Sequence, residues 1–135
     1  MVQLNTDPAS QLATLLSTQV SGLRVYTNNG IPTSGIPDEF VSIDMNGGIQ
    51  GLDTKKEVAT CVLAVSIYEK LLSTGSANTT KANILLGKFQ SIFDVCAKTT
   101  GFTFMINPNS MVYDGKSILS GYSTKVLNIN VIINN

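Results

Sequence analysis

The chain has 135 residues, of which only 13 % are charged, and its nine basic residues balance nine acidic ones. A neutral chain without a basic cluster lacks the charge that binding to nucleic-acid phosphates requires, which excludes that class of function. An average globular domain carries about 25 % charged residues. Because exposed charge keeps monomers apart, this low charge predicts that other subunits cover part of the surface. A monomer whose surface is polar without being charged is the alternative.

The length is typical of one domain with one core. The N-terminus has no basic region followed by an apolar run, so we expect no signal peptide. The longest apolar stretch, residues 58–72, contains Glu69 and Lys70, and we expect no membrane span. Cys61 and Cys96 stand apart in apolar segments without a motif, which predicts two free thiols in a reducing cytosol.

The first element is predicted to be a short amphipathic helix. Asp7 is a good N-cap, and Pro8 suits a first helical turn, where the missing N–H costs nothing. Gly22 is placed to end the helix, and a strand is expected at Leu23–Thr27. The apolar residues at helical spacing are Leu12, Leu15, Leu16 and Val20.

The next segment, NNGIPTSGIP at residues 28–37, contains two copies of Gly-Ile-Pro. Each proline removes a backbone donor and disfavours helix at the residue before it, so no regular element passes through the segment. It lacks the lysine and the following helix of a phosphate-binding loop. We predict a stiff, exposed excursion between two strands of one sheet.

Strand character resumes at Phe40–Met45, and residues 57–72 can be read in two ways. Apolar side chains alternate along this stretch, which favours a long central strand buried on both faces. The apolar residues of this stretch also fit one face of a helix, with Thr54 and Glu57 as its capping box. The β-branched content favours the strand.

The clearest helix is expected at Lys81–Lys98, with Asn78 or Thr79 as its cap and Gly101 after its end. Its apolar stripe consists of Ala82, Leu85, Leu86, Phe89, Ile92, Phe93 and Cys96. Two strands follow, at Phe102–Ile106 and Tyr122–Ile133, and the second is apolar on one side and largely polar on the other.

This order of elements predicts an α+β fold. We expect a mostly antiparallel mixed sheet with the short N-terminal helix and the longer helix packed on one face.

The sequence contains few residues of the types that carry out catalysis. The chain has no histidine, which removes the commonest general base and metal ligand, so neither an enzyme nor a metal site is expected. Four carboxylates in the first half could in principle supply an acid–base pair: Asp38, Glu39, Asp44 and Asp53. Asp38 and Glu39 follow a proline, and a solvated turn is the simpler interpretation of these two. The glycine-rich residues 47–51 and the loop 73–80 lack the flanking residues of a nucleotide site, and no cofactor is expected.

Most of the chain resembles the tail-terminator, or tail-completion, proteins of long-tailed bacteriophages. The resemblance is carried by the strand LRVYT, the proline-bearing loop, the strand EFVSIDM and its Gly-Gly turn, TCVLAVSIYEKL, TTKANILLGKFQSIFDVCAKTTG and SGYSTKVLNINVIIN. Residues 107–121 carry no pattern of that family.

The resemblance implies a single tail-terminator-like domain over residues 1–135 and a structural role in the virion. Proteins of that family form a ring, usually a hexamer, that docks on the last ring of the tail tube and stops its growth. The ring joins the tube to the head connector, and DNA passes through its hole. The implied partners are therefore other copies of the chain, the major tail tube protein and the connector proteins, with assembly in the host cytoplasm and no membrane.

In such a ring we expect the proline-bearing loop to be an interface, formed by Ile31, Pro32, Ile36, Pro37 and Asp38. Another head–tail joining or neck protein is the alternative within this class. A monomeric binding or adaptor domain of cellular origin is the alternative outside it.

Overall fold

A computed structural model describes residues 7–28, 30–51, 58–107, 113–115 and 119–134. Within these residues the chain forms two helices and one eight-stranded sheet, which confirms the predicted α+β fold. The elements are α1 (Pro8–Gln19), β1 (Arg24–Thr27), β2 (Glu39–Met45), β3 (Gln50–Gly51), β4 (Val58–Lys70), α2 (Thr79–Ile92), β5 (Ala97–Thr99), β6 (Phe102–Ile106), β7 (Tyr113–Gly115) and β8 (Tyr122–Asn134).

The sheet is built around β4 and β8, two strands of 13 residues that pair antiparallel along their whole length. The strand order is β1-β2-β4-β8-β6-β5, with β3 also paired to β4 and β7 also paired to β8. The β1–β2 pair is parallel and the other pairs are antiparallel. The expected mostly antiparallel mixed sheet is therefore confirmed.

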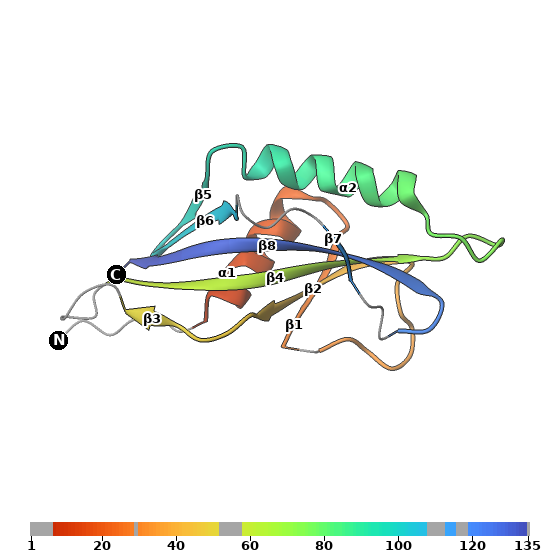
Figure 1. Cartoon of the computed structure of the whole chain (residues 1–135), viewed down its shortest axis with the longest axis horizontal. Coiled ribbons are helices and arrows are strands. Elements are labelled where there is room, and N and C mark those ends of the chain that lie inside the picture. The colour runs from red at the N-terminus through yellow and green to blue at the C-terminus, as the bar shows by residue number, and fades with distance from the viewer. Residues whose placement is uncertain (1–6, 29, 52–57, 108–112, 116–118, 135) are drawn as a thin grey trace.

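Both helices contribute to a core on one face of the sheet. In Figure 1, α1 crosses behind β4 and β8, and α2 runs nearly parallel to these strands. The largest fully buried side chains of the core that the helices share with the sheet come from α1, α2 and four strands: Leu12, Leu16, Ile43, Leu63, Ile67, Leu85, Phe89, Phe104, Leu127, Ile129 and Ile133.

The first helix forms as predicted. The side chain of Asp7 accepts a hydrogen bond from the backbone N–H of Ser10 at 3.2 Å, and Pro8 occupies the first helical position. After the helix, Gly22 has a φ of +81°, which a glycine adopts without steric cost. This turn leads into β1 at Arg24, one residue later than expected.

Residues 58–70 are a strand, which resolves the ambiguity of the sequence in favour of alternation. The expectation of burial on both faces is only half right. The side chains at alternate positions from Ala59 to Ile67 are buried under the helices, whereas those from Val58 to Ser66 on the other side are half-buried. The reason is that neither described helix covers this second face.

The predicted end of the second helix is wrong. The side chain of Asn78 caps α2 by accepting from the N–H of Lys81 at 3.2 Å, but the helix ends at Ile92 and not at Lys98. Lys98 lies in β5, which pairs with β6 across a turn at Gly101. Pairing with β6 satisfies the backbone groups of β5, and this tertiary contact overrides the helical periodicity of the sequence.

Three short strands, β3, β5 and β7, were not predicted. Each has two or three residues and is held by pairing with a longer neighbour, so it has no periodic pattern of its own. Residues 52–57, which include Asp53, Lys55 and the expected capping box, lie outside the described residues.

The packing of α2 predicts the effect of truncating its central anchor. Phe89 has no exposed surface, and Phe89→Ala is expected to lower the free energy of unfolding by about 3–5 kcal/mol, because it leaves a cavity under the helix. Urea denaturation measures the change. Lys88→Ala on the exposed side of the same helix is the control and should stay within about 0.5 kcal/mol. Equal effects of the two substitutions would contradict this packing.

Candidate functional site

The predicted interface loop, residues 28–38, is fixed at both ends. At its start the N–H of Asn28 bonds to the carbonyl oxygen of Ile43, and the N–H of Gly30 bonds to that of Thr27. At its end the N–H of Lys70 bonds to the carbonyl oxygen of Asp38 at 2.8 Å. The loop is thus tied to β2 and β4 and does not extend freely into solvent.

Gly30 is required by the tight turn at the start of this loop. A Cβ atom added at Gly30 would lie 2.9 Å from the carbonyl oxygen of Thr27, closer than real Cβ contacts. Asn28 adopts a φ of +54°, a conformation that asparagine tolerates better than most residues. Asn28 and Gly30 therefore suit the turn that follows β1.

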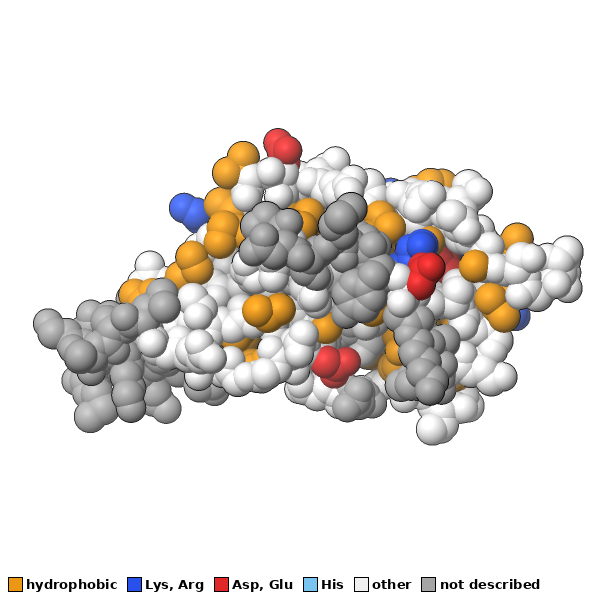
Figure 2. All heavy atoms as spheres, in the orientation of Figure 1, with side chains coloured by type: hydrophobic (Ala, Val, Ile, Leu, Met, Phe, Trp, Pro, Cys, Tyr) orange, Lys and Arg blue, Asp and Glu red, His pale blue; other side chains and the backbone are white. Residues whose placement is uncertain are grey.

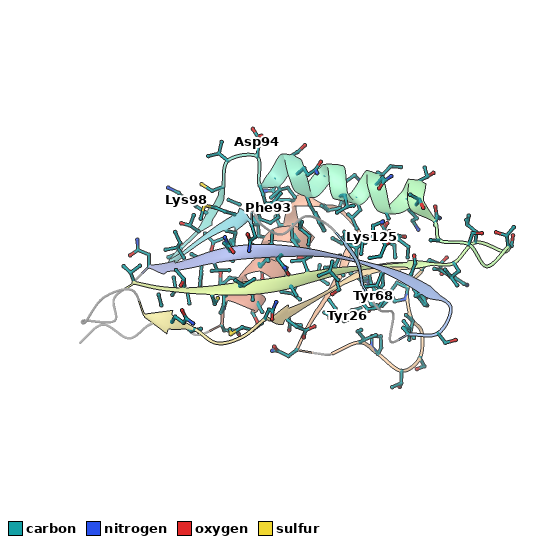
Figure 3. The ribbon with its side chains drawn as sticks, viewed as in Figure 1. Tyr26, Tyr68, Phe93, Asp94, Lys98 and Lys125 are labelled. Atoms are coloured by element: carbon teal, nitrogen blue, oxygen red, sulfur yellow. The ribbon has the colours of Figure 1, made fainter. Side chains whose placement is uncertain are left out.

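An aromatic cluster lies beside the loop, on the sheet face that the helices leave open. Phe40 is fully buried at its centre, stacked on Tyr68 with ring centroids 4.7 Å apart. The rings of Tyr26 and Tyr122 meet Phe40 edge to face at 5.6 and 5.7 Å. Figure 3 shows Tyr26 and Tyr68 at the same part of the sheet. These four rings come from β1, β2, β4 and β8, so the cluster joins four strands.

Tyr122 connects the aromatic cluster to the loop. Its hydroxyl donates a hydrogen bond to the carbonyl oxygen of Pro37 at 2.7 Å and lies 3.4 Å from that of Ile36. Burial and the nearby charge of Asp38 raise the pKa of Tyr122 further above neutral pH. The second Gly-Ile-Pro unit is therefore anchored to β8.

The five predicted interface residues are close in sequence but differ in exposure. Ile31, Pro32, Ile36 and Pro37 are half-buried, and Asp38 is exposed. The tip between the two Gly-Ile-Pro units, residues 33–35, is exposed. Asp38 lies 3.8 Å from Lys70 in an exposed ion pair, which contributes little to stability.

A buried acid lies next to the end of the loop. Glu69 is 1 % exposed, and the β2–β4 register places it directly opposite Glu39 on the helix-covered face. It lines a hollow of about 270 Å³ at the start of α2, together with Asp38, Lys70, Leu71, Leu72, Ser73, Asn78 and Lys81. The hollow and the loop share Asp38, so they form one continuous region of the surface.

Glu69 stays protonated at neutral pH. Burial, and then contact with the carboxyl group of Glu39 and its charge, raise the pKa of Glu69 to about 9, although the charge of Lys81 opposes this shift. A neutral acid avoids the cost of an unpaired charge in the interior. The β2–β4 register thus places a neutral buried acid beside Glu39, and neither carboxyl oxygen of Glu69 has a hydrogen-bond partner in the described part of the chain.

Two of the carboxylates considered as an acid–base pair, Glu39 and Asp44, do not come together, and Asp53 lies outside the described residues. Glu39 and Asp44 are five positions apart on β2, so they point to opposite faces of the sheet. Asp44 accepts a hydrogen bond from the hydroxyl of Ser42 at 3.3 Å. Among the described residues, no three His, Cys, Asp or Glu side chains are grouped so that they could hold a metal ion.

Two further expectations concern the described residues directly. Neither Cys61 nor Cys96 forms a disulfide, as predicted, and burial raises the pKa of the Cys61 thiol. Neither of the two described helices is long and apolar enough to cross a bilayer.

Sequence reasoning missed Glu69 and Tyr122. Both lie at the ends of long strands, where the sequence pattern marks them as ordinary strand positions. An acid in an otherwise apolar alternating stripe was the available signal for Glu69. No signal identified Tyr122, because its partner lies 85 residues away in sequence.

The chain resembles known protein structures in its fold. No protein-family model and no curated protein matches the chain. Among the solved structures that the chain resembles, one is similar over 93 % of this chain and 89 % of its own chain, with a TM-score of 0.57 and 10 % sequence identity. At this level of identity, the likeness supports the α+β fold alone.

The hydrogen bond from Tyr122 predicts that Tyr122→Phe loosens the loop. Loss of the bond to Pro37 should lower the free energy of unfolding by about 0.5–1.5 kcal/mol and speed amide exchange in residues 30–38. Tyr26→Phe is the control, because the Tyr26 hydroxyl makes no hydrogen bond to a described residue. If amide exchange in the loop is unchanged in Tyr122→Phe, the Tyr122 hydroxyl does not hold the loop in place.

The buried acid predicts a specific pH dependence of stability. The folded chain holds the Glu69 proton up to about pH 9, whereas the unfolded chain releases it above about pH 4.5. The folded state therefore binds more protons across this window, and stability falls as the pH rises, by at most about 1.4 kcal/mol per pH unit.

Glu69→Gln keeps the shape of the side chain and removes the titration. We expect urea denaturation of this variant to show a flatter dependence on pH between about pH 5 and about pH 9 than the natural chain shows. Asp94→Asn, at an exposed carboxylate, should leave the slope unchanged. A natural chain whose stability rises over this range would contradict the assignment.

Proposed function

We propose that this chain is a structural assembly protein: the subunit of a homo-oligomeric ring, a hexamer, that ends a bacteriophage tail tube and joins it to the head connector. The proposal rests on the resemblance of most of the chain to tail-terminator proteins and on its low charge. It places the protein in the tail or neck of a virion, assembled in the host cytoplasm, with DNA passing through the ring. In this role the protein is not an enzyme and needs no cofactor.

The observation that carries the proposal is the anchored loop. Its half-buried isoleucines and prolines are held on a rigid base by Tyr122 and by the backbone bond to Lys70. A surface segment that is already ordered loses little conformational entropy when a partner binds it. Such a segment suits repeated docking between identical subunits.

The first experiment measures the mass of the purified chain in solution and its binding to the ends of tail tubes. The proposal expects the purified chain to have the mass of a ring, and that ring to bind the ends of purified tail tubes and stop their growth. A ring that binds the connector but not the tube end would favour another head–tail joining protein. A monomer indifferent to tubes would favour an adaptor domain and would refute the ring.

The second experiment tests the loop. Ile31→Ser with Ile36→Ser should weaken ring assembly or tube docking about tenfold or more, because apolar area at the contact is lost. Concentration-dependent sedimentation and tube-binding titrations measure the two steps. Thermal melting of the dilute chain checks that the variant stays folded.

The matched control is Thr33→Ala with Ser34→Ala, which changes two exposed side chains in the same loop. Assembly and docking should be unchanged in this control. If the double isoleucine variant assembles and docks like the natural chain, the loop is not an interface.

A further inference from the structure

The connection between β2 and β3 presents an Asn-Gly sequence to solvent. Asn46 and Gly47 follow directly after β2, and both are exposed. The backbone N–H of Asn46 bonds to the carbonyl oxygen of Val62 at 2.8 Å, so β4 holds the chain at this point. At Gln50 the chain enters β3, which pairs with the same strand β4. The Asn-Gly pair therefore lies in a short connection that β4 holds at both ends.

The backbone nitrogen of Gly47 is not engaged by the described part of the chain. Its N–H donates no hydrogen bond to any described residue. Gly47 has a φ of +87°, and a Cβ atom added there would meet nothing within 4 Å. A glycine also has no side chain of its own to hinder approach to its nitrogen. The Gly47 nitrogen and the side-chain amide of Asn46 are thus adjacent along the chain, and water reaches both residues.

Such a pair carries the groups for deamidation, a reaction that needs only water. The nitrogen of Gly47, after losing its proton to hydroxide, attacks Cγ of Asn46 and forms a C–N bond. The bond from Cγ to Nδ2 breaks, and Nδ2 takes up a proton and leaves as ammonia. Water then opens the resulting succinimide ring at either of its two carbonyl carbons. The products are aspartate, with the ordinary main chain, and isoaspartate, whose main chain runs through Cγ.

A second Asn-Gly sequence, at residues 29–30, provides a comparison within the same chain. The backbone N–H of Gly30 donates to the carbonyl oxygen of Thr27 at 3.0 Å. This bond must break before the Gly30 nitrogen can lose its proton and attack, whereas the Gly47 nitrogen has no such bond to a described residue. We propose that the folded chain deamidates itself at Asn46, in preference to the Asn-Gly sequence at residues 29–30. The reaction needs only the folded chain, so this inference does not depend on the proposed ring.

The first consequence of the reaction is a new charge beside an uncharged hollow. A hollow of about 430 Å³ opens on the sheet face away from the helices, and its lining includes Gly48 and Val62, the backbone partner of Asn46. None of the lining residues is charged, and in Figure 2 the described side chains near the β3 end of the sheet are hydrophobic or uncharged polar ones. Both products carry a carboxyl group that is ionised above about pH 4. Each conversion thus adds a negative charge at the rim of this hollow, two positions after Asp44.

The second consequence is a longer main chain wherever the product is isoaspartate. The extra methylene group lies between residue 46 and Gly47, in a connection that is held by the hydrogen bond to Val62 and by the pairing of β3 with β4. Because β3 has only two residues, its pairing is the weaker of the two attachments to β4. We therefore expect the amide protons of β3 to exchange faster in chains that carry isoaspartate.

Ageing of the purified chain tests the site directly. One sample is kept folded at mildly alkaline pH, where a backbone nitrogen loses its proton more readily, and circular dichroism checks that it stays folded. A matched sample is kept unfolded in guanidinium chloride at the same pH. Peptide mapping by mass spectrometry measures conversion at positions 46 and 29 separately. We expect both positions to convert in the unfolded chain, and position 46 to convert at least severalfold faster than position 29 in the folded chain.

A matched variant assigns the reaction to one residue. Asn46→Gln fits the same exposed position, which has no positive φ, but its longer side chain must close a larger ring and reacts far more slowly. The acidic form that accumulates in the aged natural chain on isoelectric focusing should therefore be nearly absent in this variant. Asn46→Asp carries the new charge without the extra methylene group. Amide exchange in β3 should rise in the aged natural chain and stay unchanged in Asn46→Asp.

Three results would overturn the proposal. The first is an Asn46 that stays intact in the folded chain, whatever happens in the unfolded sample. The second is equal conversion of positions 46 and 29 in the folded chain, because the fold then selects neither. The third is an acidic form that accumulates equally fast in Asn46→Gln, because the reaction then lies elsewhere. Unchanged exchange in β3 of a chain that contains isoaspartate would refute the effect on the backbone.

Discussion

The antiparallel pairing of β4 and β8 is the interaction on which the rest of the structure depends. The pair runs without interruption from Val58 opposite Asn134 to Lys70 opposite Tyr122. The other edge of β4 holds β2 and β3, and the other edge of β8 holds β6 and β7. A slip of one residue would turn every side chain of a strand to the opposite face, so this register decides which residues meet the helices.

The register gives the sheet two faces of different character. One face is buried, and both helices pack against it. On the same face Glu39 lies opposite Glu69. The other face is half-buried and holds the aromatic cluster around Phe40 at one end. At its other end this face is neutral and hollowed.

The anchored loop presents its apolar side chains from a backbone that the fold already holds in place. The hydroxyl of Tyr122 holds the loop at Pro37, and the backbone N–H of Lys70 holds it at Asp38. Rigid presentation lowers the entropic cost of association. This property is the physical reason for proposing the loop as an interface.

The sequence by itself determined the elements whose patterns are long and regular. Helix α1 with its Asp7 cap and the closing strand from Tyr122 follow from local periodicity and capping chemistry. At residues 57–72 the sequence left a strand and a helix open, and the structure has the strand. The sequence also marked the Gly-Ile-Pro loop as a stiff excursion. The tertiary structure decided where α2 stops and β5 begins, that Glu69 is buried against another acid, and that Tyr122 holds the loop. These features depend on strand register and on contacts between residues far apart in sequence, which local patterns do not encode.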